Sequence, residues 1–485
     1  MKAPFAYIQK RLCLLSVLLL CATTKPAAQI ATNQPKRELR AVWLTTIKNL
    51  DWPSTPAKTT AGIMRQKQEL VDILDRLHAA NFNAIVLQTR IRGTVIYPSA
   101  IEPLDAAIGS PAILDSYDPL AFAIEECHKR GMQLHAWLVA MPGNKTAQIK
   151  ALGQQALNRR KPELILKTSD GNMLDPGIPE TADYIASICE EITRRYDIDG
   201  INFDYIRYPE KEIRFNDQAT YRRYATPGQS LADWRRSNIN RIVQIIHDRV
   251  KAIKPGVAIS CSPVGKYADT RRYSAGGWNA LNAVYQDAKL WVSQGWMDIL
   301  MPMQYFRGRH YYPFLLDWKE GAANRTIASG IGIYQVHREQ QDWPLSEIES
   351  QIHYCRQHHL GGQVFFRSQF VTDNTKGIYD LLQRNLYRTK ALPPQLLDVN
   401  GQPFPFDSTQ VTYVLYRSSN YPVDTEDANN IYKVGLTQPT LPVNPHMPEA
   451  WQPYYAVTAI DRYGRESEPV QLSTPYHPHT DLPKP

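Results

Sequence analysis

The chain is poor in the features that mark several large classes of protein. Its 485 residues include only six cysteines, and no two of them form a CxxC pair or a spacing typical of metal ligands. It has no glycine-rich dinucleotide loop, no phosphate loop, no HExxH motif and no nucleophile elbow followed by the other members of a serine triad. These absences argue against nucleotide-dependent enzymes, zinc proteases and serine hydrolases, and we expect no cofactor and no metal ion.

Long hydrophobic runs are also scarce, and the one at the N-terminus is short. Leu12–Ala22 covers about half of the ~20 residues that a membrane span requires. Basic residues precede this run and Pro26–Gln29 follows it, which is typical of a secretory signal cleaved after Ala28. We therefore expect a bacterial exported protein, periplasmic or at the cell surface, with no integral membrane span after cleavage. A lipid anchor at Cys21 is the less favoured alternative, because Leu20 is larger than the residue that usually precedes a lipidated cysteine.

The positive charge of the chain belongs largely to this signal. Residues 1–28 contain four basic residues and no acidic one, so their removal lowers the formal net charge from +8 to +4. No basic run elsewhere predicts a nucleic-acid partner, and +4 is compatible with weak affinity for an anionic cell-wall polymer. The mature chain keeps four cysteines that we expect to be buried free thiols, although export permits one disulfide: Cys127, Cys189, Cys261 and Cys355.

The chain does contain a repeated alternation of short apolar runs and amphipathic segments. Eight runs have the character of buried parallel strands: 40–47, 84–91, 133–140, 200–206, 258–264, 298–305, 326–334 and 362–368. Eight segments between and after them have helical spacing: 63–80, 119–129, 180–196, 231–254, 280–293, 313–324, 345–358 and 375–387. Eight strand–helix units predict an α/β fold, a (β/α)8 TIM-type barrel, with a doubly wound open sheet as the alternative.

Long loops follow the first four predicted strands, at residues 48–60, 92–116, 141–177 and 210–230. The loops after the strands build the active face of a barrel. We therefore expect these four loops to lie on one rim and to wall a groove there.

The composition changes after residue 387. Residues 389–405 are rich in proline and polar residues, typical of a linker, and short β-rich runs follow at 412–417, 431–434 and 454–460. The last run, a turn at Gly464 and a return strand resemble the final hairpin of a fibronectin type III module, although a generic hairpin has the same pattern. We assign the chain to five parts: a signal (1–28), a leader (29–36), the barrel (37–390), a small all-β immunoglobulin- or fibronectin III-like sandwich (392–475) and a tail (476–485).

Near its C-terminal end, the fourth predicted strand contains Asp204, the residue that first suggests a function. Strand side chains alternate, so Asn202 and Asp204 share one face, while Tyr205 shares the other with the apolar residues of the run. Inward groups near the C-terminal end of a barrel strand are where catalytic residues lie. Asp204 is therefore the candidate catalytic residue, and a strand-end aspartate paired with Arg207 is the alternative.

The other groups at the predicted strand ends are rich in aromatic, amide and guanidinium side chains. This combination suits sugars, because aromatic faces pack on pyranose rings and amides and guanidinium groups bind polar substituents. We predict substrate contacts from ten residues: Trp43, Gln88, Arg90, Trp137, Asp175, Asn202, Arg207, Gln304, Tyr305 and Arg367.

Glycoside cleavage requires two carboxyl groups, about 5 Å apart for retention and ~6.5–9.5 Å apart for inversion. Asp204 is the predicted first member, as nucleophile or base, and Arg90 and Arg207 are expected to keep it ionised because positive charges lower a carboxyl pKa. Asp175 also suits a turn or cap role, and we expect His135 to be a core residue rather than a metal ligand. The second carboxyl group stays open among six acids of the rim loops: Asp51, Glu102, Asp175, Glu210, Asp269 and Glu339.

Five stretches occur in a characteristic order: Arg37–Leu44 with Asp51–Pro53, Leu87–Arg90 with Tyr97–Ser99, Leu174–Gly177, Asp199–Pro209 and Met301–Tyr305. Together they resemble the glycosyl-hydrolase-like family 10, also called domain of unknown function 187, over roughly residues 37–390. The resemblance implies a (β/α)8 barrel hydrolase of bacterial exported or lipid-anchored proteins. Some members act on peptidoglycan strands freed of their stem peptides. Only Asp204 is carried over as catalytic.

Two positions depart from the family. Tyr205 stands where members often have a second consecutive acid, and Thr94 follows Gly93 where they often have aspartate. We predict an exported glycoside hydrolase that cleaves a bacterial cell-wall or related amino-sugar glycan by carboxylate acid–base chemistry, with a polysaccharide as its partner. A non-catalytic glycan-binding protein on the same barrel, favoured by the missing acid, and an adhesion or scaffold protein acting through the C-terminal domain stay open.

Overall fold

A computed structural model describes residues 34–439 and 453–472, and the residues from Pro35 onward form one compact unit. The predicted signal with its cleavage after Ala28, the alternative anchor at Cys21 and the tail lie outside the described residues. Within these ranges no helix has both the length and the apolar character that a membrane crossing demands.

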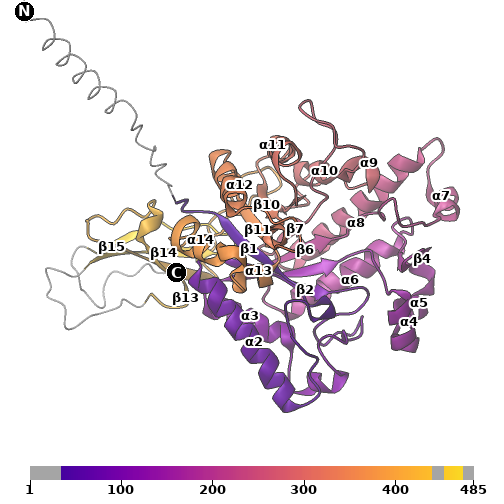
Figure 1. The fold of residues 1–485 in the computed structure, drawn as a ribbon, viewed down its shortest axis with the longest axis horizontal. Coiled ribbons are helices and arrows are strands. Elements are labelled where there is room, and N and C mark those ends of the chain that lie inside the picture. The colour runs from indigo at the N-terminus through magenta and orange to yellow at the C-terminus, as the bar shows by residue number, and fades with distance from the viewer. Residues whose placement is uncertain (1–33, 440–452, 473–485) are drawn as a thin grey trace, which may run out of the picture. The chain divides into compact units, whose positions relative to one another are not determined.

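Eight parallel strand positions close into a barrel (Figure 1). They are β1 (Leu39–Leu44), β2 (Ala84–Arg90), β3 (Gln133–Val139), β6 (Gly200–Asp204), β7 (Ala258–Cys261), β8 (Ile299–Leu300) with β9 (Met303–Gln304), β10 (Thr326–Ile331) and β11 (Gly362–Phe366). β11 pairs with both β10 and β1, which closes the ring and excludes the open sheet. The sixth predicted strand is divided around Pro302, because proline has no N–H to donate to a neighbouring strand. The Pro302 carbonyl oxygen accepts from the amides of Gly330 and Gln304.

The predicted helices surround this barrel. They are α2 (Thr60–Ala79), α3 (Pro119–Lys129), α6 (Glu180–Arg195), α8 (Leu231–Ile253), α11 (Tyr312–Glu320) and α12 (Leu345–Gln357). Side-chain oxygens of Thr59, Asp118 and Ser230 cap α2, α3 and α8, which fixes where these helices begin.

Two predicted helices are interrupted. The segment 280–293 forms α9 (Ala280–Ala283) and α10 (Ala288–Ser293), and α10 begins anew at its own cap, Asp287. The segment 375–387 begins with a 3-10 turn, in which Lys376 has a φ of 56°, and continues through α14 (Ile378–Leu381) into a π-turn at Leu382–Leu386. A short α13 (Ser368–Thr372) precedes it.

The long loops are more ordered than the sequence predicts. The loop after β3 carries α4 (Thr146–Leu152), α5 (Leu157–Arg160) and a small hairpin of β4 (Ile165–Thr168) and β5 (Gly171–Leu174). The loop after β6 carries α7 (Gln218–Tyr224). These insertions follow the C-terminal ends of their strands and therefore stand on the rim where active sites of such barrels lie.

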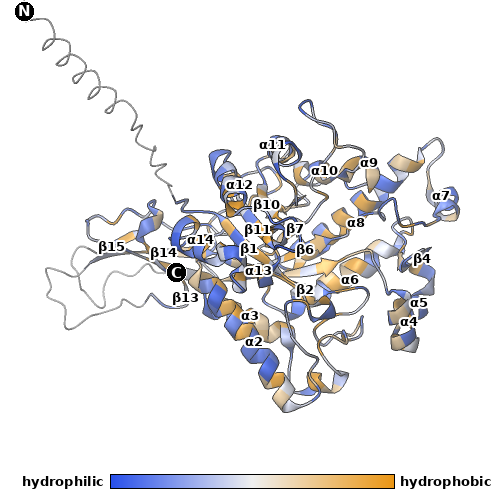
Figure 2. Ribbon diagram, viewed as in Figure 1, coloured by the Kyte–Doolittle hydropathy of each residue, from blue (hydrophilic) through white to orange (hydrophobic). Residues whose placement is uncertain are grey.

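The hydrophobic core has two layers that follow the alternation of the strands. One cluster holds Leu39, Ala41 and Trp43 of β1 and fills the barrel interior, and the other holds Val42 and Leu44 and packs against the helices. Figure 2 shows hydrophobic residues concentrated in the strands and along part of each covering helix. The inward positions of the fourth strand are therefore Gly200, Asn202 and Asp204, as the sequence predicts.

The predicted linker packs against the barrel. The Leu392 amide donates to the carbonyl oxygen of Lys36 at 2.8 Å, and Arg325 donates to the carbonyl oxygens of Leu397 and Asp398. Leu396 is buried in the interior cluster beside Leu39 and Ala84, which are first residues of their strands. This segment therefore contributes to closing the N-terminal end of the barrel, opposite the rim of long loops.

The C-terminal residues form a four-stranded antiparallel sheet in the order β13-β12-β14-β15. Its strands are β12 (Val411–Ser418), β13 (Ile431–Leu436), β14 (Tyr454–Asp461) and β15 (Val470–Leu472). At the predicted hairpin turn Gly464 has a φ of 75°, and Asp461 Oδ1 accepts from the amides of Tyr463 and Arg465. The all-β character is confirmed; the described residues form a single sheet, and the fibronectin type III assignment stays a prediction.

All four cysteines in the described ranges are buried and free, as expected: Cys127, Cys189, Cys261 and Cys355.

Candidate active site

Asp204 is the last residue of β6, on the inner face of the barrel. It pairs in register with Val139 of β3, and its carbonyl oxygen accepts from the Ala140 amide at 2.8 Å. The strand ends here because Tyr205 has a φ of 51°, in the left-handed region. This turn carries the Tyr205 ring to the interior cluster, so the prediction that it shares the outer face with the apolar residues of the strand is wrong.

The Asp204 carboxyl group is buried, and burial raises its pKa to about 6. The Arg207 charge, the Tyr205 amide at 2.8 Å and the Trp137 indole act in the opposite direction, and the Glu210 charge adds to the rise. Desolvation disfavours the charged form of a carboxyl group, and at Asp204 its effect on the pKa exceeds that of the three stabilising groups. The prediction that nearby arginines hold the pKa low is therefore wrong, and Asp204 exchanges its proton close to neutral pH.

Arg90 is fully engaged elsewhere. Its Nε and Nη2 donate to the two carboxylate oxygens of Glu102 at 2.8 and 2.7 Å, and its Nη1 donates to the carbonyl oxygens of Val139 and Ala140. The Tyr184 hydroxyl also donates to Glu102 at 2.8 Å. Every nitrogen of this guanidinium has a partner within the protein, so Arg90 fixes the end of β3 and the position of Glu102.

Arg207 lies three residues beyond Asp204, is only 4% exposed, and has few partners. Its Nη2 donates to Glu210 at 2.6 Å, and its guanidinium lies 4.5 Å from the centre of the Tyr205 ring and 5.9 Å from that of Trp278. Its Nε and Nη1 are buried without a hydrogen-bond partner among the described residues. Arg207 is thus held by one carboxylate and two rings with two nitrogen atoms still unmatched.

Aromatic side chains form one wall of the same barrel mouth. The Phe366 ring stacks on Tyr305 at 5.6 Å between centroids and meets the edge of Trp43 at 6.2 Å. Tyr334 lies against both Tyr305 and Phe366. Tyr305 is half-buried and lies within electrostatic reach of Asp204, whose charge raises its pKa further. Flat apolar faces beside a carboxyl group are what a sugar ring packs against.

Asn202, one pleat below Asp204, belongs to the buried polar layer beneath the site. Its Oδ1 accepts from Ser262 Oγ at 3.0 Å and from Trp43 Nε1 at 3.5 Å, and its Nδ2 donates to Ser260 Oγ at 3.0 Å. It is fully buried and positions the Trp43 ring.

The remaining predicted contact residues have structural partners. The Gln88 side chain accepts from the amides of Thr46 and Ile47, and Asp175 accepts from the Gly177 amide and the Thr220 hydroxyl. Burial raises the pKa of Asp175. Gln304 donates to the Gly265 carbonyl oxygen, while its own Oε1 is buried and unmatched, and Arg367 forms an ion pair with Asp51.

Of the six candidates for the second carboxyl group, Glu210 is the one whose charge acts on Asp204. Asp51 is engaged by Arg367 and Glu102 by Arg90, and both are buried. Asp175 and Asp269 accept from turn amides, and Glu339 is exposed. Glu210 forms an ion pair with Arg207, and its side chain is 28% exposed, so a ligand can reach it.

Sequence reasoning missed three aromatic residues of this site: Tyr205, Trp278 and Phe366. Phe366 precedes Arg367 at the end of the eighth predicted strand, so its position was a usable signal. Trp278 lies in a loop far beyond β7, and no spacing rule brings it to Arg207.

His135 is a buried core residue, as predicted. Its Nε2 lies 3.2 Å from Gln133 Oε1, and burial lowers its pKa. The described part of the chain contains no group of three or more histidine, cysteine or acidic side chains that would hold a metal ion.

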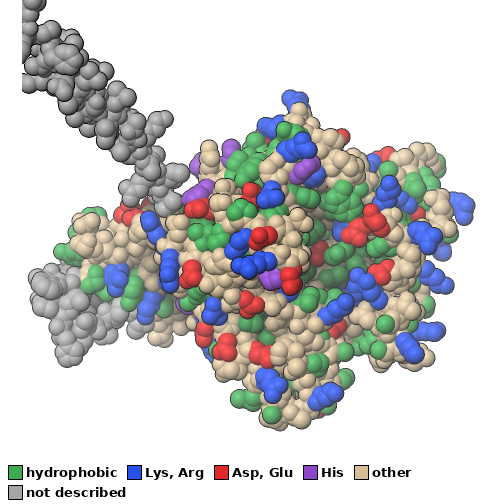
Figure 3. Space-filling model, in the orientation of Figure 1, with side chains coloured by type: hydrophobic (Ala, Val, Ile, Leu, Met, Phe, Trp, Pro, Cys, Tyr) green, Lys and Arg blue, Asp and Glu red, His purple; other side chains and the backbone are tan. Residues whose placement is uncertain are grey.

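The space-filling view shows the surface hollowed between the part of the chain that carries α8 and the part that carries α6 and β4 (Figure 3). Hydrophobic and a few acidic side chains show in this hollow. It lies on the side of the long βα loops, which agrees with the groove predicted for that rim.

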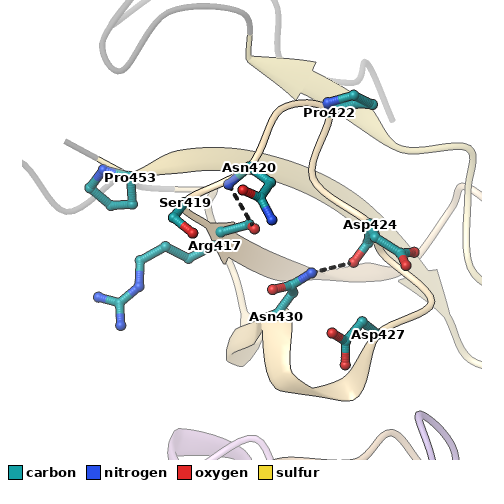
Figure 4. A pocket seen from close by; sticks show the side chains of 9 residues that line it. Arg417, Ser419, Asn420, Pro422, Asp424, Asp427, Asn430 and Pro453 are labelled. Atoms are coloured by element: carbon teal, nitrogen blue, oxygen red, sulfur yellow. Dashed lines mark hydrogen bonds between the residues drawn. The ribbon is translucent and has the colours of Figure 1, made fainter. Parts of the chain in front are cut away.

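A second concavity lies on the C-terminal sheet, at the end of β12 (Figure 4). It has a volume of about 510 Å³ and a polar lining that includes Arg417, Asn420, Asp424 and Asn430. Asn430 Nδ2 donates to the Asp424 carbonyl oxygen at 2.8 Å, and the Asn420 amide donates to Ser418 Oγ at 3.1 Å. These polar groups stabilise the loop 418–430, and no buried unmatched donor or acceptor among the described residues points into the concavity.

Comparison with known proteins gives one family. A family model described as Glycosyl hydrolase-like 10 matches residues 38–341. The chain is 34% identical over 388 residues to the Bacillus subtilis (strain 168) protein named Glycosyl hydrolase YngK, covering 76% of this chain and 75% of that one. It is 32% identical over 383 residues to Glycosyl hydrolase DigH of Escherichia coli (strain K12), covering 72% of this chain and 87% of that one.

One solved structure supports the barrel by its fold. The PgaB (BpsB) glycoside hydrolase domain from Bordetella bronchiseptica superposes with a TM-score of 0.50 at 13% identity, over 72% of this chain and 98% of that domain. At this identity the likeness concerns the fold alone.

Proposed function

Since the chain belongs to the glycosyl hydrolase-like 10 family and is a glycoside hydrolase, we propose that its substrate is an amino-sugar glycan of the bacterial cell wall and that it is exported to reach it. The observation that carries the site assignment is the Asp204 carboxyl group, buried at the end of the fourth barrel strand with a pKa of about 6 beside an aromatic wall. Export is supported by the sequence of residues 1–28, and the amino-sugar substrate by the amide and guanidinium groups of the rim.

In this proposal Asp204 is the proton donor. A glycosidic oxygen must be protonated as its bond to the sugar breaks, and a carboxyl group raised towards neutral pH by an apolar site suits this task. The Tyr205 amide donates to the carboxyl group at 2.8 Å and holds it in one orientation. After the bond breaks, Asp204 is left ionised, and Arg207 stabilises that charge.

Glu210 is the second carboxyl group in this proposal. It forms an ion pair with Arg207, and in this proposal it attacks the sugar carbon or takes the proton of the attacking water while Asp204 protonates the departing oxygen. Tyr205 occupies the position where many relatives have a second acid, and Glu210, five residues further along, supplies that acid from the following loop.

The test is hydrolysis of defined glycans. The purified mature protein and its Asp204→Asn variant are incubated with peptide-free peptidoglycan strands and with a panel of soluble polysaccharides, and products are identified by mass spectrometry. New chain ends from the wild type but not from the variant would support the proposal and identify the cleaved linkage. Measurable binding to a glycan with no products would favour the non-catalytic alternative.

A further inference from the structure

We propose that Arg207 binds a carboxylate group carried by the sugar at the cleaved bond, so that the substrate is an anionic glycan. This inference rests on the proposed function, because it names the chemistry of the substrate for the same site. It makes Arg207 a residue that determines specificity, in addition to its contact with Glu210.

The first observation is the unmatched donors of Arg207. Its Nε and Nη1 carry three N–H bonds that find no acceptor among the described residues, although the residue is 4% exposed. A buried donor without a partner is destabilising, and more so when it is charged, so native structures rarely leave one without a reason. An acceptor that enters with the substrate supplies the missing partner.

The second observation is how Arg207 is held. Nη2 donates to Glu210, and the guanidinium carbon lies over the rings of Tyr205 and Trp278, at 4.5 and 5.9 Å from their centres. The head group is thereby oriented before any ligand arrives, which lowers the entropy lost on binding. Three other buried arginines, Arg40, Arg241 and Arg356, each leave only one nitrogen unmatched.

The third observation is the charge around the site. Burial raises the pKa of Tyr205, and the Arg92 charge opposes that rise; Asp170 lies 4.0 Å from Arg92 and 3.0 Å from Lys145. Arg207 itself has one acidic partner, Glu210, and its unmatched donors suit an anionic group. Hydrogen bonds between a guanidinium and a carboxylate are about twice as strong as neutral ones.

Two kinds of glycan supply such a carboxylate. A peptidoglycan strand without stem peptides carries it on the lactyl ether of every second sugar, and a polymer with uronic acids carries it on the sugar ring. The experiment therefore uses both, each beside a version in which the carboxyl groups have been reduced to alcohols. This reduction removes the charge and leaves the chain length and the linkages unchanged.

The direct measurement is binding, which does not depend on turnover. The Asp204→Asn variant, which should leave the glycan intact, is titrated by calorimetry with oligosaccharides from each of the four preparations. We expect at least one anionic preparation to bind about 10- to 100-fold more tightly than its reduced counterpart, and the better of the two identifies the source of the carboxylate. Equal affinity for both members of each pair would overturn the inference, whether or not the wild type hydrolyses them.

Substitution of Arg207 assigns the effect to this residue. In the same Asp204→Asn background, Arg207→Gln should abolish the preference for the anionic member and Arg207→Lys should keep part of it. Arg236→Gln is the matched control, because Arg236 also pairs with an acid three residues away, Asp233, at 2.6 Å but on α8. If the Arg207→Gln protein keeps the full preference, Arg207 is not the carboxylate site.

If Arg207→Gln fails to fold, Arg207→Lys and the comparison of natural and reduced glycans still decide the question. If the wild type cleaves natural and reduced glycans with the same kcat/KM, the substrate inference fails while the proposed hydrolase function stands. If the wild type cleaves none of them but binds the anionic member preferentially, the hydrolase proposal fails while the carboxylate site stands.

Discussion

Two arginine–glutamate pairs, one at the end of β2 and one just beyond the end of β6, differ in how completely they are satisfied. Arg90 has a partner for every nitrogen, with Glu102 and two carbonyl oxygens around it, and both side chains are buried. Arg207 shares one nitrogen with Glu210 and leaves two unmatched, and Glu210 remains 28% exposed. A buried pair that is fully satisfied fixes structure, whereas an incompletely satisfied one is available to a ligand.

The largest expected effect is on activity and falls on the incompletely satisfied pair. Glu210→Gln should lower kcat by about 10²- to 10⁴-fold, because it removes the charge of the second carboxyl group, and it should lower the free energy of unfolding by about 1–3 kcal/mol, because the buried Arg207 loses its ion-pair partner. Activity on the glycan identified for the wild type, measured beside denaturant unfolding, checks this. Near-normal turnover in Glu210→Gln would remove Glu210 from the chemistry and return the choice to the other five acids.

The next effect is on stability and falls on the satisfied pair. Arg90→Gln should lower the free energy of unfolding by about 3–5 kcal/mol, because it leaves the buried Glu102 charge without its partner. Urea unfolding followed by circular dichroism measures the loss. Arg236→Gln again serves as the control and should cost less than about 1 kcal/mol. If Arg90→Gln lowered the free energy of unfolding by no more than the control does, the Arg90–Glu102 pair would not have the structural role that distinguishes it from Arg207–Glu210.

A third effect concerns the dependence of stability on pH. The pKa of Asp204 rises from an ordinary value of 3.8 to about 6 on folding. Well below pH 3.8, Asp204 is protonated in both the folded and the unfolded protein, so its raised pKa does not affect stability. Above pH 6, Asp204 is ionised in both, and the folded protein is less stable because it holds a buried charge. Asp204→Asn should therefore be more stable than the wild type by about 1–3 kcal/mol at pH 7–8.

This gain should shrink as the pH falls from 6 to 4 and vanish below that range. Thermal or denaturant unfolding of both proteins at a series of pH values measures it. A difference in stability that is the same at pH 4 and pH 8 would mean that the asparagine acts through packing and that the Asp204 pKa is not raised.

The smallest expected effect concerns how Trp137 influences the pKa of Asp204. The Trp137 indole favours the charged form of Asp204, and phenylalanine retains the apolar ring without the N–H. Trp137→Phe should move the titration of Asp204, read from the pH dependence of kcat/KM, to higher pH by less than about one unit. A shift to lower pH would show that the indole acts chiefly by excluding water.

Most of the fold could be predicted from the pattern of apolar runs in the sequence. Eight apolar runs predicted the barrel strands to within a few residues at their ends. This was possible because the alternation of buried strands and amphipathic helices can be read from short stretches of sequence. The helix at 280–293 and the sixth strand were predicted whole and are divided, since the cap at Asp287 and the missing N–H of Pro302 act at single residues.

The site was predicted less completely, for a physical reason. Asp204 follows from strand position alone, but Arg90 and Arg207 look alike in the sequence, and only their surroundings separate them. Which arginine finds Glu102, and which is left beside Tyr205 and Trp278, depends on contacts between segments up to 71 residues apart, which no spacing rule encodes.

The central claim is that Asp204 donates the proton in glycoside cleavage, and the pH dependence of kcat/KM tests it most directly. The account predicts that kcat/KM of the wild type falls as the pH rises through about 6, because the carboxyl group then loses the proton it must give. A rate that rises through the same pH would require ionised Asp204 and would contradict the assignment.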